Sequence, residues 1–332
     1  MVPTLTSDMF EKLAPEFGLS VWVEPRWRSF GYLQLHDGTR RYWNGSALDL
    51  NTVGAAELTR DKAYTNLVLR KAGFPVPQGH AFGSSEWCAS TGSTEGFEEA
   101  LTYADSLGYP LIVKPNSSQG GRLVFRAMNR DDLAASLNSI FREHTLALIE
   151  EKISGRDARL LVLDGEVVLA YERLPLTVVG NGKHSIHELM LMRAEALVRI
   201  GRPTRVLEEE GRVAFTVRQE GDYGLNTVLP KGEELVLLPS ANLATGGSTV
   251  RIGEGLHQTF KKMAVEAVQC LNLRFAGVDI MTNRSANWEA AADSGTSILE
   301  VNGKQPAVTH FAHGHAKEAE DFYRKLLQAL VR

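Results

Sequence analysis

The sequence has only two cysteines, Cys88 and Cys270, among its 332 residues. Two cysteines cannot build the set of disulfides that stabilises small secreted domains, so we expect free thiols and a reducing compartment, the cytoplasm. No apolar run approaches the roughly 18 residues that a membrane span needs. The first residues also lack a basic segment followed by an apolar one. We therefore expect a globular protein without a membrane segment or a signal peptide.

Positive charge is not in excess either. The formal net charge is −4 at pH 7 and the isoelectric point is near 6.2, whereas a general nucleic-acid-binding protein is usually basic. We therefore expect no nucleic-acid partner. The sequence also lacks a GxxxxGK[ST] phosphate loop and any Ser/His/Asp or Cys/His set with a recognisable local signature. These absences argue against a Walker-type site and against a protein nucleophile.

Aromatic residues are concentrated at the start of the chain, where residues 1–55 hold Trp22, Trp27 and Trp43. These tryptophans lie in short β-like pieces that are separated by Gly, Asp and Asn. We interpret them as packing residues of a small sheet rather than as a ligand cage.

The rest of the chain alternates between helical and strand patterns, which predicts an α+β fold. The apolar spacing predicts a helix over 57–72 and a hairpin that turns at Asp164–Gly165. We expect four regions, which are residues 1–55, 56–110, 111–155 and 156–332.

Polar residues interrupt two apolar strands near the end of the chain. Glu300 and Asn302 lie two positions apart in "ILEVNG", so their side chains point to the same face of a strand. Asp279 lies in a second strand, "FAGVDIM", and the short linker between the two favours antiparallel pairing. Three oxygen ligands would then converge, as suits Mg²⁺ that also binds phosphate oxygens. A salt bridge of Glu300 and a turn that starts at Asn302 are the structural alternative.

A second polar segment follows the strand "YPLIVKP". Lys114 ends this strand, and the loop "NSSQGG" comes directly after it. Its hydroxyl groups and backbone N–H groups could face phosphates, and a plain hairpin is the commoner explanation of such a loop.

The ordered set of segments resembles the ATP-grasp superfamily, in the branch of carboxylate–amine ligases that contains glutathione synthetase and ribosomal-protein glutamate ligases. It is most similar to the ATP-grasp portions of cyanophycin synthetase and of N-acetylglutaminylglutamine amide synthase, from about Leu50 to the C-terminus. The segments that carry the likeness are "TRDKAYTNLVLRKAGFPVP", "YPLIVKPNSSQGG", "ALIEEKISGRDARLLVLDGEVVLAYERLP", "VVGNGKHSI", "ANLATGGSTV", "GVDIM" and "LEVNG". The resemblance implies two α+β subdomains that clasp ATP, with residues 111–155 as the lid and 156–332 as the subdomain with the metal site, after a short N-terminal β-rich region.

The resemblance also implies roles for individual residues. Residues that would bind ATP are Lys62, Lys114, Asn116, Ser117, Ser118, Gly120, Gly121, Glu150, Glu151, Ile153 and Asp157. Residues that would hold two Mg²⁺ ions, with Mn²⁺ as an alternative, are Asp279, Glu300 and Asn302. Residues that would take part in catalysis, beside the phosphates or the acceptor, are Lys114, Arg159, Arg173 and Asn242.

The implied activity is an ADP-forming ligation of an acid to an amine through an acylphosphate, on amino-acid or peptide substrates. Two alternatives stay open, which are an ATP-binding protein without turnover and a ligase that modifies a protein or peptide partner. The phosphate loop is shorter than in the relatives, and Arg122 falls near a position that is usually glycine. Ligases of this kind are often dimers or tetramers, so a homodimer or homotetramer is the expected assembly.

Overall fold

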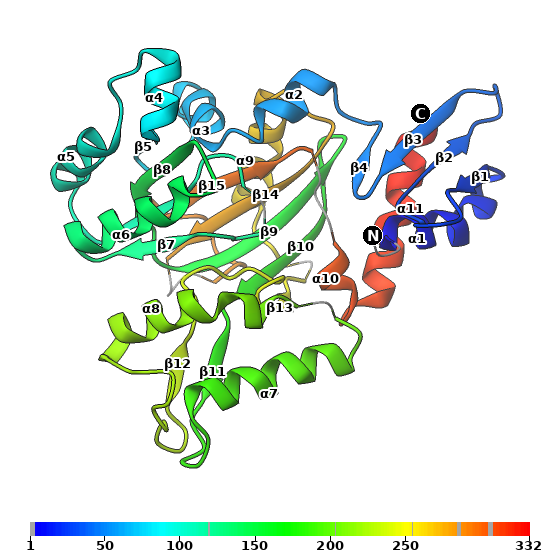
Figure 1. Ribbon diagram of the computed structural model, residues 1–332. Helices are drawn as coiled ribbons and strands as arrows, with labels where there is room; N and C mark the ends of the chain where they lie inside the picture. The colour runs from blue at the N-terminus through cyan, green and yellow to red at the C-terminus, as the bar shows by residue number, and fades with distance from the viewer. Residues whose placement is uncertain (1–3, 119, 203, 254, 284–286, 305–307) are drawn as a thin grey trace.

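The computed structural model describes residues 4–118, 120–202, 204–253, 255–283, 287–304 and 308–332. Their strands form a five-stranded antiparallel sheet in the order β13-β10-β9-β14-β15, two four-stranded sheets and a two-stranded ribbon. Figure 1 shows the five-stranded sheet in the middle of the molecule, with the other units around it. Helices and antiparallel sheets occur together, as the α+β prediction requires.

The five-stranded sheet is built around a hairpin. Its strands are β9 (Arg156–Leu163), β10 (Glu166–Leu174), β13 (Ser248–Arg251), β14 (Phe275–Thr282) and β15 (Ser297–Asn302). Asp164 and Gly165 connect β9 to β10 with φ of 47° and 83°. Two successive residues in the left-handed region are what a tight Asp-Gly turn requires. The predicted hairpin is confirmed.

Strands β14 and β15 pair antiparallel, as predicted from their short connection. Asp279 lies opposite Glu300, and Gly277 lies opposite Asn302. On its other side, β14 places Asp279 opposite Arg159 of β9. Since directly opposite residues share a face of the sheet, these polar side chains are brought to one place.

The two faces of this sheet have different covers. One face carries Leu160, Val162 and Val278, which pack against α9 (Gln258–Cys270). The other carries Leu161 and Leu163, which pack in one cluster with residues of α11 (Ala316–Val331). Arg159 alternates in step with Leu161 and Leu163, so it extends this second face beyond the part that α11 covers.

The second unit is a four-stranded sheet with helices packed on it. Its strands, in the order β5-β8-β6-β7, and its helices are β5 (Gly79–Gly83), β8 (Leu146–Glu151), β6 (Leu111–Pro115), β7 (Phe125–Ala127), α4 (Ser85–Thr91), α5 (Phe97–Leu107) and α6 (Arg130–Phe141). Leu101 of α5 and Leu137 of α6 are buried in one cluster with Val113 and Ile149 of the sheet. This unit therefore has its own core.

The helix predicted over 57–72 is wrong as a single element. The structure has α2 (Val53–Leu58) and α3 (Lys62–Lys71) instead. Asp61 lies between them and accepts a hydrogen bond from the backbone N–H of Tyr64 at 2.8 Å. An aspartate in this position caps the start of a new helix, which explains the break.

The N-terminal unit contains a helix that the sequence reasoning missed. Its elements are α1 (Leu5–Leu13), the 3₁₀ turn η1 (Ala14–Phe17), β1 (Ser20–Val23), β2 (Phe30–Gln34), β3 (Arg40–Asn44) and β4 (Ala47–Leu48). Phe10 of α1 contacts Trp43 and, at a ring-centroid distance of 5.9 Å, Tyr323 of α11. Trp43 is buried, as predicted. The same prediction is wrong for Trp22 and Trp27, which are each 41% exposed.

The third unit lies between β10 and β13 in the chain and below the central sheet in Figure 1. Its elements are β11 (Thr177–Val179), α7 (Ile186–Arg199), η2 (Val206–Glu209), α8 (Glu210–Gly221) and β12 (Glu234–Val236). Val178, Ile186, Val213 and Leu235 are buried together in a separate cluster. The C-terminal part of the chain also contains the short α10 (Thr309–Ala312). None of the helices that the structure describes is long and apolar enough to cross a membrane.

Asn51 joins the N-terminal unit to the central sheet and gives a first testable prediction. Its amide nitrogen donates to the carbonyl oxygens of Phe275 and Gly303, at 2.6 and 2.7 Å, and its oxygen accepts from the N–H groups of Arg274 and Phe275. We expect Asn51→Ala to lower the free energy of unfolding by about 3 kcal/mol, because several backbone groups lose their partner. Urea denaturation measures this change.

Asn44→Ala is the matched control, because Asn44 is exposed on β3. Its replacement should change stability by less than about 0.5 kcal/mol. Equal losses in the two variants would contradict the role given to Asn51.

Candidate functional site

A cavity of about 1150 Å³ lies where the β5-β8-β6-β7 sheet, the central five-stranded sheet and the third unit meet. Of the residues predicted to bind ATP, to hold Mg²⁺ or to act in catalysis, all except Asn116 line it. These residues come from α3, β6, β8, β9, β10, β14, β15 and the loops after β6, β8 and β12. The structure thus brings together side chains that lie up to 240 positions apart, from Lys62 to Asn302.

Charged side chains form a buried network on the floor of the cavity. Arg159 donates to both oxygens of Asp279, from Nε to Oδ1 at 2.6 Å and from a terminal nitrogen to Oδ2 at 2.7 Å. Arg173 contacts Asp279 Oδ2 at 3.1 Å and donates to Asp157 at 2.7 Å. Adjacent strands place these four residues side by side. The network fixes both arginines relative to the strand that carries Asp279.

The two carboxyl groups of this network differ in their pKa. Burial favours the neutral form of Asp279, but Arg159 and Arg173 outweigh it and hold the pKa below its usual range. Burial dominates at Asp157 and raises its pKa, although Arg173 pairs with it and Asp279 adds to the rise. Asp279 is therefore the carboxylate that stays ionised throughout the neutral range.

Two of the three predicted metal ligands on β14 and β15, Glu300 and Asn302, suit a hard divalent cation. Glu300 keeps 26% of its side chain exposed, and Oε1 lies 3.5 Å from Lys62 Nζ. In the orientation that satisfies both of its amide atoms, Asn302 donates to Glu300 Oε1 at 3.3 Å and accepts from Arg159 at 3.0 Å. Carboxylate and carboxamide oxygens are the donors that Mg²⁺ prefers.

Asp279 is the less open member of the predicted ligand set. A carboxylate has about four lone-pair sites, and three of those on Asp279 face guanidinium nitrogens. Among the described residues, no cluster of three or more His, Cys, Asp and Glu side chains could hold a metal. The pair of Glu300 and Asn302 fits Mg²⁺ if water and phosphate oxygens supply the other ligands, and Asp279 adds at most one bond.

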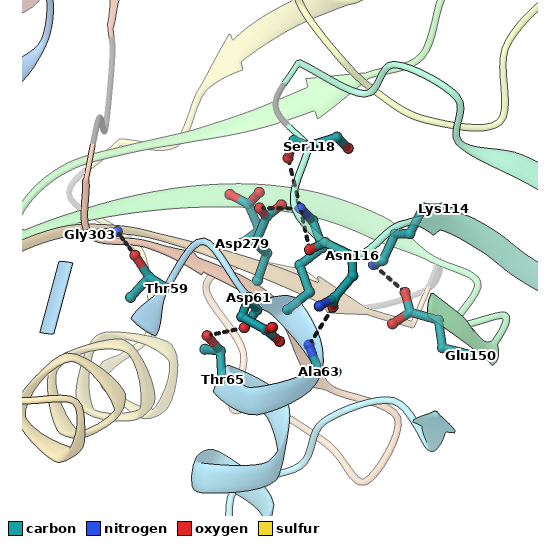
Figure 2. A network of polar contacts seen from close by, with 12 residues as sticks. Thr59, Asp61, Ala63, Thr65, Lys114, Asn116, Ser118, Glu150, Asp279 and Gly303 are labelled. Atoms are coloured by element: carbon teal, nitrogen blue, oxygen red, sulfur yellow. Dashed lines mark hydrogen bonds and ion pairs between the residues drawn. The ribbon is translucent and has the colours of Figure 1, made fainter. Parts of the chain in front are cut away.

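The two predicted phosphate lysines both lie at the cavity with a partner. Lys62 Nζ donates to the carbonyl oxygen of Ser118 at 2.7 Å, which ties the start of α3 to the loop after β6. Lys114 pairs with Glu150 in a largely buried ion pair (Figure 2). The family resemblance implies that Glu150 binds ATP, and here its carboxylate faces Lys114 on the neighbouring strand.

Asn116 lies behind the loop rather than in the cavity. Its side-chain oxygen accepts from the N–H of Ala63 at 2.9 Å (Figure 2). Its carbonyl oxygen accepts from the N–H of Lys62 at 3.3 Å. The side chain is almost completely buried. Asn116 therefore positions the start of α3, and with it Lys62.

Arginines of the third unit hold the loop after β6, and the sequence reasoning missed them. Arg205 donates to the carbonyl oxygen of Gly120 at 3.1 Å. Arg212 donates to the carbonyl oxygens of Gly121 and Val124 at 2.9 and 2.7 Å. No motif marks these arginines, and the only signal in the sequence is the density of charge in "RPTRVLEEEGR".

Asn242 packs directly on the same loop. An added Cβ at Gly121, whose φ is 67°, would lie 2.9 Å from the Cβ of Asn242. The oxygen of Asn242 accepts from the N–H of Ala244 at 2.8 Å, which fixes the turn that carries it. Glycine is therefore needed at 121 for its backbone conformation and for this close approach.

Part of the cavity wall is apolar. Ile112, Ile153, Met281 and Leu299 line it. Glu151 accepts from the N–H of Gln78 at 2.8 Å, which fixes the strand end just before Ile153. A flat apolar ring would find a suitable surface here.

Comparison with known proteins supports a family likeness. A family profile described as "D-ala D-ala ligase C-terminus" matches residues 68–180. Cyanophycin synthetase from Trichormus variabilis is 31% identical over 267 residues, which cover 80% of this chain and 28% of that protein. A bifunctional glutathione biosynthesis protein from Desulfotalea psychrophila is 27% identical over 335 residues, which cover 98% of this chain and 41% of that protein.

Among solved structures, a bifunctional glutathione synthetase from Pasteurella multocida has a TM-score of 0.58 with 22% identity. The match covers 98% of this chain and 44% of that one, and it concerns the fold alone. The chain spans less than half the length of these three relatives. Together the matches confirm the family resemblance and the fold class predicted from the sequence.

Proposed function

We propose that this chain, which belongs to the ATP-grasp superfamily, is an ADP-forming ligase that joins a carboxylic acid to an amine through an acylphosphate. The observation that carries the proposal is the convergence of distant segments on one cavity. Two lysines, a loop rich in Ser and Gly, and the oxygen groups of β14 and β15 all line it. Cationic groups, backbone donors and oxygen ligands together are what a triphosphate with its metal needs.

The nucleotide would lie with its base against the apolar part of the cavity wall. Ile112, Ile153, Met281 and Leu299 supply the flat surface. Backbone groups at Glu151 and Ile153 would bind the edge of the adenine, and Asp157 would reach the ribose.

The phosphates would lie toward Lys62, Lys114 and the loop from Ser117 to Gly121. Mg²⁺, in one or two ions held by Glu300 and Asn302, would neutralise charge on the transferring phosphoryl group. Lys62 is well placed to act with them, because its Nζ lies 3.5 Å from Glu300. The loop, held by Arg205 and Arg212, would cover the phosphates and keep water from the reactive intermediate.

The reaction balances without a protein nucleophile. An oxygen of the substrate carboxylate attacks the γ-phosphorus, the bond from that phosphorus to the bridging oxygen breaks, and ADP leaves. The amine then attacks the acyl carbon of the acylphosphate and loses a proton. The bond from that carbon to the phosphate oxygen breaks, so the phosphate carries away one oxygen of the acid. Positioning and electrostatic stabilisation are the main contributions that such chemistry asks of the protein.

Arg159 and Arg173 would act mainly by positioning. Both guanidinium groups are held by Asp279 and Asp157. These ion pairs would hold β14 and the neighbouring strands in position beside the phosphates. They also leave little freedom for either arginine to move with the substrate.

Gly121→Ala gives a test of the loop. We expect the KM for ATP to rise about tenfold, because the left-handed backbone and the contact with Asn242 both resist a Cβ. Steady-state kinetics with varied ATP measure this effect. Gly92→Ala is the matched control, since its φ is 72° but nothing lies within 4 Å of an added Cβ. A similar KM for ATP in both variants would show that the contact with Asn242 does not matter.

Amino acids or short peptides are the proposed substrates, and the cytoplasm is the proposed compartment. The two free cysteines, Cys88 and Cys270, support a reducing compartment. Modification of a peptide partner remains the second candidate within the same chemistry, and a homodimer or homotetramer is the proposed assembly.

The experiment that tests the proposal is ADP release from Mg²⁺-ATP over a matrix of acids and amines. The proposal predicts release that requires one acid and one amine together. ATP binding without release for any pair, including peptides, would instead favour a nucleotide-binding protein without turnover.

A further inference from the structure

Three arginines surround the turn from Asn242 to Gly247, whose residues Asn242, Leu243 and Ala244 line one end of the cavity. Arg202 donates to the carbonyl oxygens of Leu243 and Gly247, and Arg193 donates to that of Gly246 at 3.4 Å. The backbone N–H of Arg205 also donates to the carbonyl oxygen of Ala244 in the same turn, at 2.8 Å.

These arginines lack carboxylate partners. None of Arg193, Arg202 and Arg205 forms an ion pair with an Asp or Glu within the part of the chain that the structure describes. The neighbouring Arg212, in contrast, pairs with Glu209 at 2.6 Å. Burial, with Arg193 nearby, lowers the pKa of Arg202 to about 10. Uncompensated cations around a partly buried turn create a positive potential that favours an anion.

Two polar atoms at the same end of the cavity also lack a partner. Ser240 Oγ and His310 Nδ1 are buried and have no hydrogen-bond partner among the described residues, and both residues line the cavity together with Arg205. Buried polar groups are normally paired, so unpaired ones in a cavity indicate a ligand. Burial, then Arg202, His313 and Arg205, lower the pKa of His310 to about 4, so its imidazole is neutral at pH 7 and can donate from Nδ1.

We propose that this end of the cavity binds a second carboxylate of the acid substrate, through Arg205, Ser240 and His310. The substrate acid is thus a dicarboxylate, or a peptide that ends in an acidic residue, with one carboxylate at the γ-phosphate and the other in this subsite. The inference rests on the proposed function for its first carboxylate and on the described residues for its second.

The position of Arg205 favours an acid over the nucleotide as its ligand. The predicted phosphate-binding groups come from α3, β6 and the loop after β6, and the side chain of Arg205 contacts that loop at the carbonyl oxygen of Gly120. One of its five N–H groups is used there. Its remaining donors share the cavity with the neutral donors of Ser240 and His310, a set that suits a carboxylate.

Binding of glutarate and of glutaramate in the presence of Mg²⁺-ADP tests the proposal without turnover. The two probes differ only in one carboxylate. We expect isothermal titration to give a dissociation constant roughly 10- to 100-fold lower for glutarate, as the loss of a charged hydrogen-bond partner implies. L-Glutamate and L-glutamine form a second matched pair.

Arg205→Met should remove this preference, and Arg205→Lys should restore part of it. Arg199→Met is the control, because Arg199 lies exposed on the same unit and pairs only with Glu195 among the described residues. In turnover assays, Arg205→Met should raise the KM for the dicarboxylic acid by a larger factor than the KM for ATP, because Arg212 still holds the loop. A role in holding the loop alone would raise the KM for ATP at least as much.

Each result decides a different point. Equal binding of glutarate and glutaramate to the unchanged protein would overturn the dicarboxylate subsite, even if ADP release shows a ligase of monocarboxylic acids. A rise in the KM for ATP with an unchanged preference would assign Arg205 to the nucleotide and also overturn it. A preference for glutarate that depends on Arg205, in a protein that never releases ADP, would support the subsite and contradict the proposed ligase.

Discussion

Replacing Glu300 by Gln is expected to lower kcat for ADP release by at least about 1000-fold while ATP still binds. The side chain of Glu300 is 26% exposed against 4% for Asp279, and among the described residues it contacts Lys62 and Asn302. Removal of its charge would take away a ligand that acts at the point where charge moves during phosphoryl transfer, an effect of several kcal/mol. Rapid-quench or coupled assays of ADP measure kcat, and fluorescence titration measures ATP binding.

The fold should tolerate this change, because the contacts of Glu300 among the described residues are long, at 3.5 Å to Lys62 and 3.3 Å to Asn302. Glu318→Gln is the matched control, since Glu318 is a carboxylate of α11 that pairs with Arg251 at 3.5 Å on the surface. Its kcat should stay within about twofold of the unchanged protein. A Glu300→Gln protein that keeps a tenth or more of kcat would show that Glu300 does not hold the metal.

Asp279→Asn is expected to lower the free energy of unfolding by about 3 to 5 kcal/mol, the cost of breaking a buried ion pair. Both oxygens of Asp279 accept from Arg159, and Oδ2 also faces Arg173. The substitution keeps the shape of the side chain but leaves two buried guanidinium groups with one carboxylate, that of Asp157, between them. Urea denaturation followed by circular dichroism measures the loss.

Asp164→Asn provides the comparison, because it breaks a similar two-bond pair with Arg274 that is partly exposed. That change should cost less than about 1 kcal/mol. If the two variants lose similar stability, the network on the floor of the cavity is not the structural element described here.

The pairing of β14 with β15 could be predicted from the sequence because its signals are local. The alternation of Glu300 and Asn302 within an apolar strand, and the short connection to the strand of Asp279, were enough to predict antiparallel pairing of the two. The Asp-Gly turn at 164–165 likewise carries its conformation in two residue types. In each case neighbouring residues determine the geometry.

The arginines that hold the loop could not be predicted in this way. Arg205 and Arg212 act on carbonyl oxygens about 85 to 91 positions earlier in the chain, and no spacing in the sequence indicates such contacts. The pairing of Lys114 with Glu150 was missed for a related reason, because it depends on the register between β6 and β8. Helix α1 is nine residues long, and it packs on α11 at the other end of the chain. Tertiary packing, rather than local pattern, defines these parts.

For two tryptophans the prediction of burial was wrong because it relied on residue type. Trp22 and Trp27 were interpreted as packing residues from their type alone, but Trp22 lies on the outer face of its sheet, where it stacks on Tyr32 at 5.5 Å. Residue type indicates burial only on average, and alternation along a strand decides it.

The most direct test of an acylphosphate at this cavity is to follow oxygen from the acid into phosphate. The acid that supports ADP release would be labelled with ¹⁸O in its reacting carboxylate, and the phosphate formed in the presence of the amine would be analysed by mass spectrometry. The proposed mechanism predicts one ¹⁸O atom in each phosphate released. Unlabelled phosphate that accumulates at the same rate as ADP would show that water, not the carboxylate, attacks ATP, and would contradict the proposed ligase.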